Sequence, residues 1–96
     1  MIRLLSIVEV VFELAGRSSV VVGPGVPRAG KWRLEIGMPL ILKLPDATEL
    51  RTVVGGFEML SPPDPGSIPL MLGPGLSKHM VPIGTEIWAD YPGRGD

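Results

Sequence analysis

Glycine and proline interrupt this chain so often that no long regular element fits between them. Of its 96 residues, 13 are glycine and 11 are proline, which is one residue in four. Such a share touches the roughly 25–30% at which disordered chains become plausible. The apolar content argues against disorder, because Leu, Ile, Val and Phe supply 31 residues, well above the roughly 20% below which chains stay disordered. We therefore expect one small, turn-rich, ordered domain.

Several classes of protein are excluded by what the chain lacks. It has no cysteine, which excludes a disulfide scaffold, a thiolate nucleophile and a cysteine zinc site. Glu9 and Glu13 interrupt the apolar N-terminal segment, so a secretory signal is not indicated. No apolar run approaches the ~20 residues of a membrane-spanning helix. We expect a cytoplasmic protein with no membrane partner and no cofactor.

The charges are balanced overall but uneven along the chain. Nine basic residues face ten acidic ones, so no global attraction to nucleic acid is expected. Residues 17–43 are predominantly basic, whereas residues 44–96 are predominantly acidic. Either the basic residues share one surface or they are scattered, solvated charges. The residues of the candidate basic patch are Arg17, Arg28, Lys31 and Arg33.

The first apolar segment, Leu4–Ala15, fits two interpretations. Its apolar spacing is compatible with a helical stripe, but its β-branched residues favour a strand. We predict a strand. Its alternation places Val8, Val10 and Phe12 on one side, with Glu9 and Glu13 on the other.

Six further segments are typical of short strands. Gly23-Pro24-Gly25 is expected to end the second strand, since a sheet interior would not tolerate it. Gly55-Gly56 indicates a bulge or a close approach by another backbone. The expected strands after the first cover residues 19–22, 32–36, 40–44, 50–60, 68–72 and 86–89.

This succession of strands predicts the fold class. No segment predicts a convincing helix, and short strands at such close spacing are typical of an all-β domain. The pattern allows a small closed antiparallel β-barrel of six to seven strands or a sandwich. We expect a single domain over residues 1–90 and a polar C-terminal tail over residues 91–96.

One glycine-rich motif has the spacing of a phosphate-binding loop but lacks its chemistry. Four residues separate Gly25 from Gly30, and Lys31 follows Gly30. A phosphate loop then needs Ser or Thr to hold magnesium, and a helix, whereas this chain has Trp32 and an alternating strand pattern. We therefore predict a basic hairpin loop and no nucleotide partner.

No catalytic or metal site emerges from the remaining polar residues. His79 is the only histidine and has no neighbours at ligand spacing, so we expect it in a surface loop. Glu9 and Glu13 could serve as an acid and base pair, but outward positions on a strand explain them equally well. Trp32 between Lys31 and Arg33 is favoured for packing over base stacking. The chain is predicted not to be an enzyme.

Four segments between residues 7 and 89 share a further pattern. An acidic and apolar strand ending at Phe12 leads to a Gly-Arg turn and a Val-Val strand, and glycines flank the third strand. Gly56-Phe57-Glu58-Met59 follows, and Gly84 introduces the last strand. In order and spacing these segments resemble the second domain of translational GTPases such as elongation factor Tu. The resemblance implies a closed barrel of that type, standing alone without the GTPase domain.

The resemblance also implies a pocket. In its relatives the barrel touches the ribosome, and in elongation factor Tu it holds the aminoacyl end of tRNA. Glu9, Phe12 and Glu58 match positions that line this pocket. Val10 stands where the pocket has an acidic residue, and residues 60–62 stand where the family has basic residues after Glu-Met. Contacts to the phosphate backbone of RNA depend on such basic residues, so these departures favour a partner other than RNA.

We therefore predict a non-enzymatic binding module that binds a protein partner or a second copy of itself. A barrel whose relatives cover part of their surface with other domains must bury that surface or make it polar. The surfaces expected to serve are the apolar, proline-rich Ser67–Leu76 and the basic loop 28–33. The alternative is an RNA-, ribosome- or tRNA-binding protein that uses the basic segment 17–43.

Overall fold

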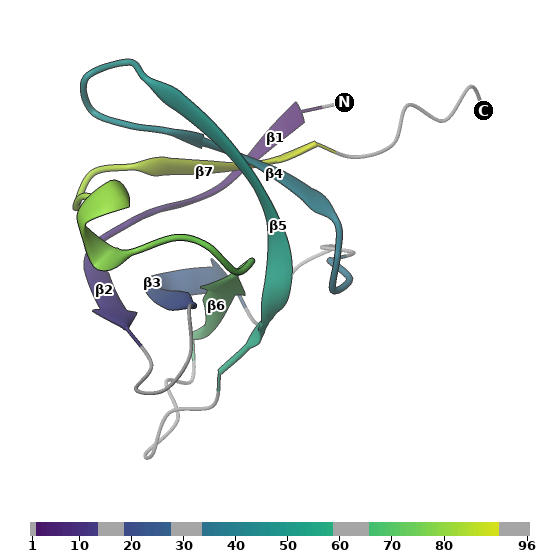
Figure 1. Ribbon diagram of the computed structural model, residues 1–96. Coiled ribbons are helices and arrows are strands. Elements are labelled where there is room, and N and C mark those ends of the chain that lie inside the picture. Colours follow the sequence, from purple (N-terminus) through teal and green to yellow (C-terminus); the bar gives the residue numbers. More distant parts are fainter. Residues whose placement is uncertain (1, 14–18, 28–33, 59–65, 91–96) are drawn as a thin grey trace.

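The computed structural model describes residues 2–13, 19–27, 34–58 and 66–90 and has an all-β fold, as predicted (Figure 1). The described part of the chain contains short strands and a single turn of 3-10 helix, η1 (Lys78–Met80). In chain order the strands are β1 (Ile2–Ile7), β2 (Val10–Glu13), β3 (Val20–Pro27), β4 (Pro39–Lys43), β5 (Glu49–Phe57), β6 (Ser67–Leu72) and β7 (Glu86–Asp90).

All strand pairs are antiparallel, and they form one sheet in the order β1-β7-β4-β5-β6-β3-β2. The long, curved strand β5 pairs with β4 and with β6, so it links the two halves of the sheet (Figure 1). The end strands β1 and β2 are separated in the chain only by Val8 and Glu9. The described residues contain seven strands, which agrees with the predicted six to seven, although two of the individual strand predictions are wrong. No ladder between described residues joins β1 to β2 to close the sheet into a ring.

The N-terminal segment is two strands, and the prediction of a single strand through it is wrong. The Val8 N–H donates to the carbonyl of Thr85 at 2.8 Å, and the Glu9 N–H donates to the carbonyl of Gly23 at 2.8 Å. These two bonds bend the chain from the side of β7 to the side of β3. The bend interrupts the alternation of side chains along the segment, so Val11 is buried on the same side as Val8, while Phe12 is 47% exposed.

The core lies inside the curled sheet and receives side chains from every strand. Burial of this apolar surface is the main stabilising contribution to the fold. Thr85 is the one buried polar residue in the described part of the chain, and its hydroxyl donates to the carbonyl of Pro82 at 2.6 Å. The core cluster consists of Leu5, Val8, Val11, Val20, Val22, Val26, Leu40, Leu42, Val54, Leu70, Leu72, Val81, Ile87 and Ala89.

Strand β3 continues through Gly23-Pro24-Gly25, which contradicts the prediction that this tripeptide ends the strand. The register against β6 shifts between Val22 and Val26, so the tripeptide is absorbed as an irregularity in the ladder. Gly25 has a φ of +87°, and a Cβ there would overlap the carbonyl of Ile68. The close packing of the two backbones therefore requires glycine at this position.

The strand predicted over residues 32–36 is wrong where the structure describes it. Residues 34–36 are not in a strand, and Ile36 is 71% exposed. The Met38 N–H donates to the carbonyl of Glu35 at 3.0 Å, and the Gly37 N–H donates to the carbonyl of Val54 at 2.7 Å. These bonds make a turn that leads into β4. Trp32 and Arg33 lie outside the described residues.

The hairpin of β4 and β5 confirms the sequence prediction for this region. Leu40 and Leu42 point into the core, and the connecting turn spans residues 45–48. The backbone N–H of Thr48 lies 2.9 Å from Oδ1 of Asp46 and stabilises the carboxylate, which lowers the pKa of Asp46 below its usual value. Asp46 thus supports the turn by the side-chain hydrogen bond typical of such residues.

The strand predicted over residues 50–60 is confirmed up to Phe57, where β5 ends; residues 59 and 60 lie outside the described residues. The register of β5 against β6 shifts between Val54 and Gly56, which is the predicted bulge. A Cβ at Gly55 would lie 2.5 Å from the carbonyl oxygen of Leu72, so another backbone approaches here as expected. Strands β6 and β7 cover the predicted segments 68–72 and 86–89. No helix in the described residues has the length and apolar character needed to cross a membrane.

We predict that Gly25→Ala lowers the free energy of unfolding by about 3 kcal/mol or more, because both the positive φ and the overlap with β6 oppose a side chain. Gly37→Ala is the matched control, since Gly37 has a φ of +94° but a Cβ added there would meet no atom within 4 Å. It should cost only about 1–2 kcal/mol. Urea denaturation measures both. Equal losses would contradict the close contact between β3 and β6.

Candidate functional site

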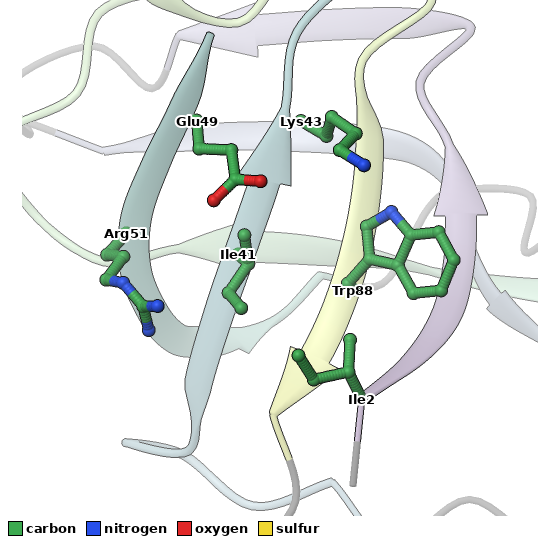
Figure 2. A pocket seen from close by; sticks show the side chains of 6 residues that line it. All are labelled: Ile2, Ile41, Lys43, Glu49, Arg51 and Trp88. Carbon is green, nitrogen blue, oxygen red and sulfur yellow. The ribbon is translucent and has the colours of Figure 1, made fainter. Parts of the chain in front are cut away.

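The outer face of β1, β7, β4 and β5 carries a shallow hollow of about 220 Å³. Figure 2 shows Ile41 in the middle of this face, with Glu49 and Arg51 toward β5 and with Trp88 and Ile2 toward β7 and β1. We call it the Trp88 face. Its residues are Ile2, Leu4, Ile41, Lys43, Glu49, Arg51 and Trp88.

The strand register brings these side chains together. Trp88 lies between Ile87 and Ala89, which are both buried in the core, so its own side chain points to the outer face. It stands directly opposite Leu4 on β1 and Ile41 on β4. Ile41 is only 7% exposed although it is not part of the core cluster. Its neighbours on the outer face therefore cover it.

Charged groups of both signs surround this apolar centre. Lys43 and Glu49 are directly opposite each other on β4 and β5. Arg51 Nη1 lies 3.8 Å from Asp90 Oδ2, in an exposed ion pair that contributes little to stability. The indole Nε1–H of Trp88 donates to Glu86 Oε1 at 3.0 Å and is oriented by it. An apolar centre with a charged border is typical of a protein interface.

A second hollow, of about 450 Å³, lies along β2. We call it the β2 groove. Val11 and Val81 are buried at its base, whereas Val10 and Ile83 are exposed. Its lining residues are Glu9, Val10, Val11, Lys78, His79, Val81, Pro82 and Ile83.

The groove is bounded at both ends by hydrogen bonds between its walls. The backbone N–H of Lys78 donates to Glu13 Oε2 at 3.1 Å, and the N–H of Gly84 donates to the carbonyl of Val8 at 2.8 Å. The segment from η1 to Gly84 therefore runs antiparallel to β2. His79 is exposed, as predicted, but it lies in η1 and not in a loop. Among the described residues no three His, Asp or Glu side chains gather in a way that could hold a metal ion.

Of the three residues of the pocket implied by the family resemblance, one lines the β2 groove and two do not. Glu9 lines the β2 groove. Phe12 lies opposite Val21 on the outer side of β2, and Glu58 follows β5, where its N–H donates to the carbonyl of Pro69 at 3.1 Å. Neither Phe12 nor Glu58 lines the groove. A shared role for the three residues stays a prediction.

The other predicted surfaces differ in what the structure says of them. Arg17, Arg28, Lys31 and Arg33, and with them the basic loop 28–33, lie outside the described residues. Most of the segment Ser67–Leu76 is strand β6, in which Pro69, Leu70 and Leu72 are buried. These three residues pack inside the fold, whereas Pro74 is exposed. A docking role for the segment stays a prediction.

Trp88 is not among the site residues predicted from the sequence, although a signal for it is present. In the segment 86–90 Ile87 and Ala89 alternate with Glu86, Trp88 and Asp90. An alternation of this kind places the tryptophan on the polar side of the strand. Its neighbours Leu4 and Ile41 could not be found in the same way, because they come from distant parts of the chain and meet only through strand pairing.

No protein-family model matches this sequence, and searches of curated proteins and of solved structures found no match.

We predict that Glu13→Ala lowers the free energy of unfolding by about 1 kcal/mol, because the N–H of Lys78 loses its acceptor. Glu13→Gln keeps an acceptor oxygen and is the matched control, with a smaller loss. Urea denaturation gives the stability, and amide hydrogen exchange at Lys78 reports the bond itself. Unchanged protection of Lys78 in Glu13→Ala would contradict the link between β2 and η1.

Proposed function

We propose that this protein is a non-enzymatic binding module whose Trp88 face docks a protein partner or a second copy. The observation that carries this proposal is the composition of the face, where Trp88, Leu4 and Ile41 are adjacent across three strands. Aromatic residues are enriched where proteins associate, and a few such anchors carry most of the binding energy. Ile2 extends the apolar centre and is 55% exposed. Contact with a partner would remove this surface from water.

The proposal includes the type of fold. We propose a barrel of the kind found as the second domain of translational GTPases. The strands at the two ends of the sheet, β1 and β2, are consecutive in the chain, so the covalent link between them closes the barrel. Seven antiparallel strands around one core support this proposal. So do the Gly56–Glu58 segment at the end of β5 and Gly84 before β7.

The charges around the Trp88 face favour a protein over RNA. Glu49 lies next to Lys43 and Arg51, and Asp90 and Glu86 are already engaged with Arg51 and Trp88. Nucleic-acid surfaces are much more positive than this, since phosphate contacts dominate their affinity. The support for the alternative, RNA or ribosome binding, comes from the basic segment 17–43 of the sequence.

We predict that Trp88→Ala weakens self-association or partner capture at least about tenfold, because truncating a central aromatic anchor typically has such an effect. Sedimentation velocity measures self-association, and recovery on the immobilised protein from the native cell measures partner capture. Circular dichroism checks that the variant stays folded.

Two isoleucines provide a matched pair for the same measurement. Ile2→Ser alters the Trp88 face, whereas Ile36→Ser alters an equally apolar residue in the turn before β4 that is 71% exposed. Only Ile2→Ser should reduce association. If the unmodified protein is a monomer and recovers no partner above the level recovered by Trp88→Ala, the proposed function is refuted. Equal effects of the two isoleucine variants would refute it as well.

The RNA alternative is tested separately by binding to tRNA and ribosomes. We expect no binding at about 50 mM salt, where phosphate contacts are strong. Filter binding of labelled tRNA and co-sedimentation with ribosomes are the measurements, with bovine serum albumin as the negative control. Tight binding that falls steeply between about 50 and 200 mM salt would instead support the RNA alternative.

A further inference from the structure

The β2 groove lies against an unpaired strand edge. β2 stands at one end of the strand order and pairs with β3 alone. Its other edge faces the groove, and Figure 1 places the η1 segment beside it. The free edge of a strand presents a row of backbone N–H and C=O groups to any chain that lies along it. The groove therefore offers backbone hydrogen bonds as well as apolar surface.

The segment from η1 to Gly84 forms the opposite wall of the groove and does not pair with the edge of β2. It is tied to the β1–β2 segment by the Lys78–Glu13 bond at one end and by the Gly84–Val8 bond at the other. Between these ties no backbone hydrogen bond joins residues 10–13 to residues 79–83 in the described part of the chain. The hollow of about 450 Å³ falls in the roughly 300–1,000 Å³ range of ligand pockets.

The side chains of the groove are suited to an extended apolar segment. Val11 and Val81 form a buried base, and Ile83 at the rim is 69% exposed. Because β2 has 4 residues and each residue of a strand rises about 3.3 Å, the edge can pair with about four residues of an extended segment. Alternate side chains of such a segment would face the base.

The charges of the groove differ between its two ends. Lys78 and His79 lie near the end of β2 at Glu13, since the N–H of Lys78 is bound there. Glu9 lies at the other end, beside the Gly84–Val8 bond. A segment that lies antiparallel to β2 begins at the basic end and finishes at Glu9. The Glu13 carboxylate also lies at the first end, where it is bound by the Lys78 N–H and is outnumbered by the side chains of Lys78 and His79. Charge complementarity therefore favours an acidic residue first and, beside Glu9, a basic residue last.

We propose that the β2 groove binds an extended peptide of the pattern acidic, apolar, basic, which adds to the free edge of β2 as an antiparallel strand. Strand addition of this kind takes affinity from backbone hydrogen bonds and specificity from alternate side chains. The antiparallel direction continues the pairing of β2 with β3, and antiparallel pairs are slightly more stable per residue. This site is separate from the Trp88 face and does not rest on it.

The direct test compares two blocked, fluorescently labelled peptides, Asp-Val-Leu-Val-Lys and its charge-reversed form Lys-Val-Leu-Val-Asp. Fluorescence anisotropy with the full chain should show the first binding at least about fivefold more tightly, from two exposed charge contacts. In the double variant Glu9→Lys/Lys78→Glu the preference should reverse, because both side chains are exposed and can be exchanged without disturbing the core. Equal affinities, or no binding of either peptide, would overturn the proposal.

Backbone pairing is tested on the peptide, so that no variant of the protein can fail to fold. N-methylation of the amides of the first peptide that face β2 removes its donors and should abolish binding, whereas N-methylation of the alternate amides should not. Nuclear magnetic resonance shifts should fall on the amides of residues 10–12, 79–81 and 83. Equal binding of both methylated peptides would refute strand addition.

Protein variants separate this site from the proposed function. Ile83→Ser should weaken the first peptide several-fold, and Ile36→Ser, a matched exposed isoleucine, should not. Trp88→Ala should leave peptide binding unchanged even where it abolishes association through the Trp88 face. Loss of peptide binding in Trp88→Ala, or equal effects of the two isoleucine variants, would contradict a separate groove.

Discussion

The bend at Val8 and Glu9 is the constraint on which the rest of the fold depends. The N–H of Val8 reaches Thr85, next to β7, and the N–H of Glu9 reaches Gly23 in β3. Two successive residues thereby hold the two ends of the strand order close together. Because both bonds are made by the main chain, any side chain at these positions that allows the bend preserves the arrangement. The curled sheet and its single core follow from this junction.

The same bend produces two surfaces with different properties. On one side it leaves β1 beside β7, so that Leu4, Trp88 and Ile41 line up across three strands and form an apolar centre with a charged border. On the other side it turns β2 away from β7 and leaves the β2 edge to face η1 across the groove. The first surface presents side chains, whereas the second presents main-chain groups as well. Each is therefore suited to a different kind of protein contact.

Much of the strand pattern could be predicted from local signals. The alternation in residues 40–44, the turn at Asp46 and the double glycine at residues 55 and 56 each have a local physical cause. The errors arose where long-range hydrogen bonds or contacts override such signals. The bend at residues 8 and 9 reverses the expected side of Phe12, and packing against Ile68 lets β3 absorb Gly25. Met38 and Val54 draw the segment before β4 into a turn.

The sequence by itself determined the all-β class and the positions of most strands, because breaker spacing and side-chain alternation act over a few residues. Only the tertiary structure decided which strands are neighbours and therefore which residues share a surface. Leu4 and Trp88 are far apart in the chain, as are Val10 and Ile83, and no local pattern relates the members of either pair. Strand pairing and the bend after β1 bring them together, since hydrogen bonds between distant main-chain groups set the register.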